Sequence, residues 1–231
     1  MLIAMCFTYN SGNYIYFGFP YLTFKQEYEC RHDASALFTD CDIEEVICPA
    51  REQSLADFEY RVNIDADYYL NNWFVEMDLM CESKVRTNIM VSARYIAFGI
   101  AGALLFAVPD RWGRKKSLLL AATVNTMTQF AIIFVPIYEL RLLGHIFMGL
   151  VMLKQAVPFV WGAELLPPSR GTISSVCLTS FDAMTLLISC LYYMFISREV
   201  VPLLLTTTVL AAAALLFLFA FVPESPQWLL S

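Results

Sequence analysis

Ionisable side chains inside long apolar stretches are the residues of this sequence best placed to do chemistry. Asp182 lies about ten residues into one such stretch, and His145 and Lys154 lie in another. A charge within hydrocarbon is costly unless it is paired or faces water, so such residues mark ion or substrate pathways. Asp182 would attract an organic cation, whereas Lys154 and His145 would favour an anion. The sequence therefore leaves the sign of a bound ion open.

Each of these residues also has a structural interpretation. Asp182 and Lys154 can neutralise each other as a buried pair. His145 can relay protons, or it can simply hydrogen-bond to a neighbour. Arg94 and Arg141 lie nearer the ends of their apolar stretches, where long basic side chains can extend to the membrane surface.

Polar and aromatic residues near the N-terminus are a second set of candidates. Asn10 and Asn13 interrupt an apolar stretch, and hydrocarbon penalises such groups unless they face protein or water. Aromatic residues beside them suit contact with an organic cation, although aromatic packing is the alternative. The predicted substrate-binding residues are Asn10, Asn13, Tyr16, Lys154, Phe159 and Asp182.

Catalytic and cofactor-binding patterns are missing from the sequence. It has two histidines, no C-x-x-C pair, no G-x-S-x-G motif and no glycine-rich loop that would cradle a phosphate. We therefore expect no enzyme activity, no metal, no cofactor and no nucleic-acid partner. Transport driven by ATP would need a phosphate loop, so any transport is expected to be facilitated or coupled to an ion.

Membrane-spanning helices are the elements expected to position these residues. Of the 231 residues, 58% are hydrophobic and 16% are charged, a balance typical of proteins that cross a membrane several times. The first span is predicted at 1–22, where a signal peptide is the alternative. Five more are predicted at 88–109, 117–135, 141–161, 173–196 and 201–222. The predicted fold class is an all-α membrane protein with six transmembrane helices.

An acidic segment, residues 23–87, separates the first two predicted spans. Between residues 24 and 88, fifteen Asp or Glu residues oppose six Lys or Arg residues, a net charge of −9. Four of the seven cysteines lie there: Cys30, Cys41, Cys48 and Cys81. An even set in one polar loop favours disulfides on an oxidising side, with three possible pairings, and free thiols are the alternative. We expect a large extracellular loop that forms a small cap.

A charged block, DRWGRKK at residues 110–116, joins the second and third predicted spans. Four of its seven residues are Lys or Arg, and short loops enriched in these residues stay on the cytoplasmic side. The acidic loop then lies outside the cell and both chain ends lie inside. The cysteine argument gives the same orientation independently.

Five motifs follow one another along the chain. They are WFVEMDLMC at 73–81, DRWGRKK at 110–116, RLLG at 141–144, the pattern of Glu164, Pro167, Arg170 and Gly171, and PESPQWL at 223–229. Their order and spacing resemble the N-terminal half of the major facilitator superfamily, and the first is similar to a motif of its organic cation/anion transporters. One position departs from the resemblance. The superfamily has glycine four residues before Asp110, and this chain has Phe106.

This resemblance implies a transporter of twelve helices in two halves, which moves a small organic ion by alternating access. The chain would then be a fragment or a shortened relative, and 223–231 would begin the linker between the halves. Expected partners are the lipid bilayer, the organic ion, and a missing C-terminal half or second subunit, and the expected location is the plasma membrane. A sugar porter and a non-transporting six-span protein that binds or regulates a partner are the alternatives.

The resemblance also implies that charged residues at the inner end hold the closed state of the transporter. For Arg114, Lys115 and Lys116, the alternative role is to fix the topology and to anchor the chain at the lipid headgroups. The expected gating residues are Asp110, Arg111, Gly113, Arg114, Lys115, Arg141, Glu164, Arg170 and Glu224.

Overall fold

A computed structural model describes residues 2–31, 37–53, 58–151, 153–167 and 170–230. Within these residues, five helical stretches are long and apolar enough to cross a membrane. They are α6 (Lys84–Leu105), α8 (Arg114–Phe134), α9 (Tyr138–Leu150) together with α10 (Leu153–Leu165), α11 (Gly171–Phe195) and α12 (Val200–Phe221). The sequence had predicted six, so the count differs by one.

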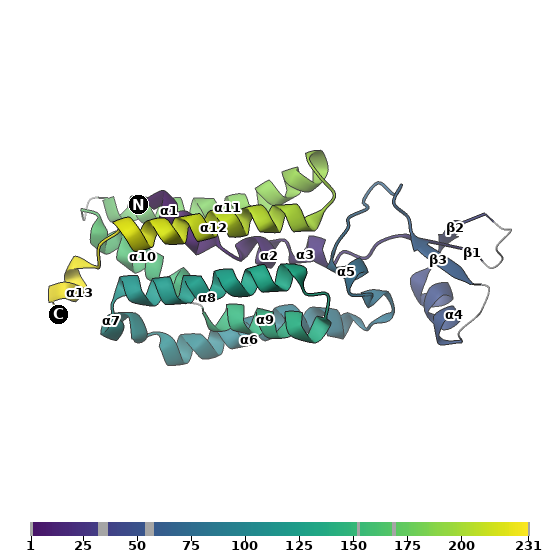
Figure 1. The fold of residues 1–231 in the computed structure, drawn as a ribbon, viewed down its shortest axis with the longest axis horizontal. Coiled ribbons are helices and arrows are strands. Elements are labelled where there is room, and N and C mark those ends of the chain that lie inside the picture. The colour runs from purple at the N-terminus through teal and green to yellow at the C-terminus, as the bar shows by residue number, and fades with distance from the viewer. Residues whose placement is uncertain (1, 32–36, 54–57, 152, 168–169, 231) are drawn as a thin grey trace.

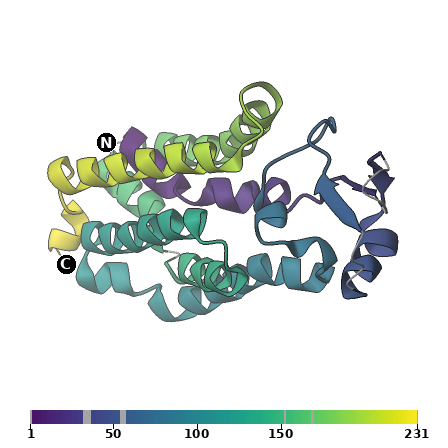
Figure 2. The same ribbon diagram turned by 45° about the vertical axis from the view of Figure 1, so that its right-hand side comes forward.

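The first predicted span accounts for the difference, because it is divided into three short helices. These are α1 (Leu2–Asn10), α2 (Asn13–Phe17) and α3 (Phe19–Leu22). Gly12, between α1 and α2, has a φ of 83°, a left-handed conformation that ends an α-helix. Figures 1 and 2 show this segment, in purple, running along the bundle between the α11 and α12 side and the α6, α8 and α9 side.

The cap is not all helical, which corrects the predicted fold class. It contains an antiparallel sheet of order β2-β1-β3, built from β1 (Tyr28–Arg31), β2 (Thr39–Cys41) and β3 (Glu59–Val62). Short helices complete it: η1 (Ile43–Ile47), α4 (Cys48–Glu52), α5 (Trp73–Glu76) and η2 (Leu79–Cys81). We call the end of the bundle that carries residues 23–83 the cap end (Figure 1).

Two disulfides staple the cap, and they select one of the three pairings that the sequence left open. Cys30 pairs with Cys41, which joins β1 to β2, and Cys48 pairs with Cys81, which joins α4 to η2. Tyr28, Ile43 and Ile47 form a small apolar core between these bridges. A domain this small buries little apolar surface, so covalent closure of its loops carries much of its stability.

Polar contacts hold the cap against the bundle. The Asn72 side chain donates to the backbone oxygens of Tyr21 (2.9 Å) and Phe24 (3.0 Å), and the Asn71 amide donates to the Arg198 carbonyl (3.0 Å). The segment that leads into α5 is therefore tied both to the end of the first predicted span and to the turn between α11 and α12.

The other end of the bundle carries both chain ends, α7 (Val108–Trp112) and α13 (Pro226–Leu230), and we call it the turn end (Figure 1). The span predicted at 88–109 ends earlier, because α6 ends at Leu105 and Pro109 lies in the first turn of α7. Phe106 is 71% exposed in the turn between these helices, so among the described residues it closes no tight helix contact.

The fourth predicted span also differs from expectation. The sequence predicted one span at 141–161, whereas α9 ends at Leu150, α10 begins at Leu153, and α10 continues past Pro158. This break lies beside the break at Gly12, where a Cβ on Gly12 would lie 2.6 Å from Met148 Cε. Two interrupted helices thus meet in the middle of the bundle.

Candidate functional site

A cavity of about 290 Å³ lies at the meeting point of these two helix breaks, and we call it the central cavity. Residues of the first predicted span, α6, the α9–α10 stretch and α11 line it. The lining includes Tyr9, Asn13, Tyr16, Arg94, Tyr95, Lys154, Gln155 and Asp182.

Asp182 faces the central cavity and has an amide partner. The Asn13 side-chain amide donates to Asp182 Oδ1 over 2.7 Å, and Gln155 in turn donates to Asn13 Oδ1 over 3.2 Å. Asp182 and Lys154 form no ion pair in the described part of the chain, so the pairing alternative is not realised. Asp182 thus lines the cavity with an amide as its hydrogen-bond partner.

Lys154 is 1% exposed, and its ammonium group binds backbone carbonyls at the break between α1 and α2. Nζ donates to the carbonyl of Tyr9 over 3.2 Å and also contacts the carbonyl of Ser11. These carbonyls are free because the turn at Gly12 ends α1. Asn125 of α8 donates to the same Ser11 carbonyl over 3.2 Å. Lys154 thus acts as a tethered cation that completes a broken helix.

Arg94 is the second buried cation of the central cavity. Arg94 is only 6% exposed, and its guanidinium carbon lies 5.1 Å from the centre of the Tyr16 ring. Its Nη1 atom has no hydrogen-bond partner among the described residues. The expectation that Arg94 extends to the membrane surface is wrong. Helix α6 begins at Lys84, four residues before the predicted start, and this places Arg94 at the middle of the helix.

Two predicted substrate-binding residues lie behind the wall of the cavity. Asn10 donates to the Cys6 carbonyl over 3.0 Å and accepts from the Thr185 hydroxyl over 3.3 Å, so its amide is used within the fold. Phe159 packs edge-on against Tyr9, with ring centres 5.3 Å apart. By contrast, Asn13, Tyr16, Lys154 and Asp182 do line the cavity, and Tyr16 also contacts the Tyr95 hydroxyl.

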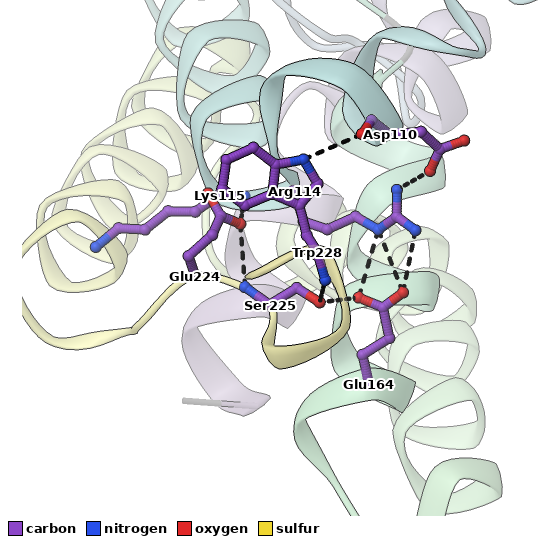
Figure 3. Close-up of polar contacts among 7 residues, drawn as sticks. All are labelled: Asp110, Arg114, Lys115, Glu164, Glu224, Ser225 and Trp228. Atoms are coloured by element: carbon purple, nitrogen blue, oxygen red, sulfur yellow. Dashed lines mark hydrogen bonds and ion pairs between the residues drawn. The ribbon is translucent and has the colours of Figure 1, made fainter. Parts of the chain in front are cut away.

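A charge network joins α7, α8, α10 and the C-terminal segment at the turn end, as Figure 3 shows. Arg114 binds Glu164 over 3.1 Å and also forms an ion pair with Asp110. Ser225 donates to Glu164 from the other side. With Arg114 16% exposed and Glu164 7% exposed at their side chains, this pair is largely removed from solvent.

Glu224 caps a helix that is distant in sequence. Helix α8 has no side-chain cap of its own, and Glu224 Oε1 accepts from the Lys115 amide over 2.7 Å and from the Ser225 amide over 3.1 Å. Gly113 lets this carboxylate approach, since a Cβ there would lie 2.6 Å from Glu224 Oε2 and its φ is 103°. Trp228 closes the cluster by donating to the Asp110 carbonyl over 3.0 Å (Figure 3).

Three expected gating residues stand apart from this network. Arg111 and Arg170 are exposed and make no side-chain contact with the network in the described chain. Arg141 lies at the cap end, fully buried, where it binds Glu76 over 2.6 Å and sits 4.5 Å from the Trp73 ring centre. It ties α9 to the cap, and it neither reaches the membrane surface nor belongs to the turn-end network.

His145 lies near this cap-end pair, one turn beyond Arg141 on α9. Its ring packs edge-on against Trp73 (6.0 Å) and Phe19 (5.9 Å), and neither ring nitrogen has a hydrogen-bond partner among the described residues. The hydrogen bond that served as the alternative to a proton relay is therefore not formed.

The sequence of the chain matches a known family of membrane transporters. A model of the family described as "Sugar (and other) transporter" matches residues 3–231. The chain belongs to this family. It is a family of the major facilitator superfamily whose members are membrane transporters and not enzymes.

Several relatives carry the names of solute carriers or of organic cation transporters. The chain is 30% identical over 194 residues to mouse "Solute carrier family 22 member 4", covering 83% of this chain and 34% of that protein. It is 27% identical over 190 residues to human "Organic cation/carnitine transporter 2", covering 79% and 34%. It is 25% identical over 169 residues to "Organic cation transporter 1" of Caenorhabditis elegans, covering 72% and 28%. The chain thus spans about a third of the length of these relatives.

Among the residues of these sites that the sequence did not predict are Arg94, Ser225 and Trp228. Arg94 carried the same signal as Asp182, a charge inside an apolar stretch, but the misplaced helix start obscured it. Ser225 and Trp228 lie in the PESPQWL motif and gave no chemical signal of their own. Their contacts with Glu164 and Asp110 join segments more than 60 residues apart, which no local pattern reports.

Proposed function

We propose that this chain forms the N-terminal half of a transporter that moves a small organic ion across a membrane by alternating access. The single observation that carries the proposal is the convergence of Arg94, Lys154 and Asp182 on one cavity. Charges at this depth are costly in a purely structural role and are typical of substrate pathways. A C-terminal half or second subunit would supply the remaining wall of the site, and the plasma membrane is the proposed location.

The charges of the central cavity favour a substrate that carries a negative group. Lys154 is committed to two backbone carbonyls, whereas Arg94 has no anionic partner among the described residues. A carboxylate placed beside Arg94 would remove the cost of burying that cation unpaired. Asp182 and Asn13 would bind a cationic or hydrogen-bonding group at the other side of the same molecule. We therefore propose a zwitterion as the preferred organic ion.

The turn-end network is proposed to hold one closed state. Separation of α10 from α7 and α8 would break the contacts of Glu164 with Arg114, and separation of the C-terminal segment would release the cap on α8. A preference of a few kcal/mol is enough to exchange two states, so a substrate that binds the open state better would shift the population.

Uptake into proteoliposomes by the complete reading frame that contains this chain would test the proposal. Labelled carnitine, as the zwitterion, is expected to enter saturably, and tetraethylammonium and benzoate are expected to enter more slowly. Arg94→Met should abolish carnitine uptake. Arg86→Met, on a half-buried residue of the same helix outside the central cavity, should leave it unchanged.

Other outcomes would favour other functions. Glucose uptake that Arg94→Met abolishes to the same extent as carnitine uptake would indicate a sugar porter. The central cavity does not favour this outcome, because a neutral sugar offers Arg94 no counter-charge. The absence of saturable flux for a broad panel of organic ions, with a folded protein, would refute transport and favour a protein that binds or regulates a partner.

A further inference from the structure

The break between α1 and α2 gathers backbone oxygens deep inside the bundle. Helix α1 ends before Gly12, and the carbonyl oxygens of Tyr9 and Ser11 accept hydrogen bonds from side chains of α8 and α10. A peptide oxygen in the middle of a membrane needs a donor or a cation, because hydrocarbon cannot solvate it. The break must therefore be completed by groups from outside the first predicted span.

Asn125 of α8 adds a side-chain oxygen to these two carbonyls. The residue is fully buried, its amide nitrogen donates to Ser11, and its Oδ1 atom has no hydrogen-bond partner among the described residues. The amide lies against the break, since a Cβ on Gly12 would lie 3.2 Å from Oδ1. A buried amide oxygen without a donor is costly, and a positive charge beside it lowers that cost.

Oxygens of this kind are the ligands of a bare alkali cation. The unwound backbone carbonyls of interrupted membrane helices coordinate Na⁺ in transporters, and carbonyl oxygens can replace the water shell of an ion. In this chain the ammonium group of Lys154 takes that place, because Nζ lies 3.2 Å from the Tyr9 oxygen and also contacts the Ser11 oxygen. An ammonium group is a compact point charge, so it can substitute for a small monovalent ion.

The contacts of Lys154 are those of a bound ion and differ from those of a salt bridge. Lys154 is 1% exposed, and its ammonium group donates to neutral carbonyls. Asp182 lines the same cavity, yet within the described ranges its carboxylate accepts from the Asn13 amide and forms no ion pair with Lys154. A lysine present only to neutralise Asp182 would bind that carboxylate instead.

We propose that the ammonium group of Lys154 occupies a site for a monovalent inorganic cation at the break between α1 and α2. The fold carries this cation as part of its own chain, and a shorter side chain at this position leaves a site that binds Na⁺. The oxygens of Tyr9, Ser11 and Asn125 are the protein ligands of the free ion. Binding of this ion is a property of the fold and does not depend on transport.

Substitution of Lys154 tests this proposal directly. Thermal unfolding of the purified Lys154→Ser chain in detergent would be followed in sodium chloride and in N-methyl-D-glucamine chloride of equal ionic strength. Sodium should raise the unfolding temperature of this variant in a saturable way, because the ion binds only the folded chain. The unaltered chain and Lys154→Met should unfold alike in both salts, since an ammonium group or an apolar chain fills the site. Radioactive sodium should show a saturable site in Lys154→Ser that the unaltered chain lacks.

Matched variants identify the ligands of the ion. In the Lys154→Ser background, Asn125→Leu should weaken sodium binding several-fold. Gln129→Leu, one turn further along α8 and also buried with unpartnered amide atoms in the described chain, should leave it unchanged.

Three outcomes would overturn the proposal. They are an equal effect of sodium on the unaltered chain, undiminished sodium binding after Asn125→Leu, and no effect of sodium on either Lys154→Ser or Lys154→Ala. The last variant opens the same space without a hydroxyl, so the test does not rest on the recovery of one protein. None of these readouts involves flux, so they stand whether or not the complete protein transports an organic ion.

Discussion

The central cavity and the turn-end network both place charged residues among apolar helices, yet they treat those charges in opposite ways. At the turn end, Arg114 has carboxylate partners on two sides and Glu164 has a further hydroxyl donor. In the central cavity, Arg94 faces an aromatic ring and has no anionic partner among the described residues. A charge with complete partners stabilises a fold, whereas a buried charge without them is destabilising until a ligand binds.

Lys154 lies between these two cases. Lys154 is only 1% exposed, but backbone carbonyls, and not a carboxylate, accept hydrogen bonds from its ammonium group. The break at Gly12 provides those carbonyls, so the sequence that interrupts the helix and the lysine that repairs it act together. We therefore expect Lys154 to stabilise the fold, as the turn-end network does, whereas Arg94 should destabilise it.

The largest effect is expected from Glu164→Gln. Loss of this carboxylate leaves Arg114 with only an exposed partner, and breaking a buried ion pair typically costs about 3–5 kcal/mol of unfolding free energy. Unfolding of the purified chain in mixed micelles would measure it. Asp110→Asn is the matched control on the same arginine, and its side chain is 62% exposed, so a change below about 1 kcal/mol is expected. Equal effects of the two variants would show that burial does not decide the strength of the network.

Gly113→Ala tests the approach of Glu224 to the start of α8. The backbone conformation at Gly113 is essentially restricted to glycine, and a Cβ would meet the carboxylate, so a loss of about 2–3 kcal/mol is expected. Gly99→Ala is the control, because a Cβ at Gly99 meets nothing within 4 Å. Gly99→Ala should stabilise the chain slightly, since alanine favours a helix interior by about 1 kcal/mol. A tolerated Gly113→Ala would argue against a close cap by Glu224.

Lys154→Met should destabilise the chain by about 2 kcal/mol, because hydrogen bonds to charged groups contribute roughly 1.5–3 kcal/mol. The Tyr9 carbonyl loses this donor, and the Ser11 carbonyl keeps only Asn125. The same unfolding measurement applies, with Lys84→Met, on an exposed residue of α6, as the control. A stabilised Lys154→Met chain would place Lys154 with Arg94, as a cation held for a ligand.

The sequence predicted the helices far better than the partners of the charges, and the reason is physical. Hydropathy is a local property, so five spans and the disulfide-bonded cap were predictable from runs of residues. The sheet in the cap was not, because strands as short as β2, with three residues, leave too little alternation to recognise. The break at Gly12 also escaped prediction, since glycine is common in membrane helices and the carbonyls it frees are satisfied from 143 residues away.

Because sequence patterns are local, they also could not predict which partners the site residues have. The charged block at 110–116 identified the turn end, but only the fold shows that Arg114, and not its neighbour Arg111, reaches Glu164. Arg141 matched a motif and was grouped with the gating residues, although its helix position places it at the cap end beside Glu76. A motif gives the identity of a residue in a family, and the partner of that residue depends on helix packing.

The smallest effect, with the opposite sign, is expected from Arg94→Met. Replacing an unpaired buried cation by an apolar side chain of similar length should stabilise the free chain by about 1–2 kcal/mol, since even complete buried ion pairs can be replaced by apolar residues without loss. Arg86, on the same helix, has a side chain that is 40% exposed and forms ion pairs with Glu82 and Glu139, so Arg86→Met should change stability by less than about 1 kcal/mol. A gain in stability together with lost uptake of carnitine would identify Arg94 as a group held at a cost for the substrate. Destabilisation by Arg94→Met would mean that the guanidinium already has sufficient partners in the fold, and the contrast between the central cavity and the turn end would then fail.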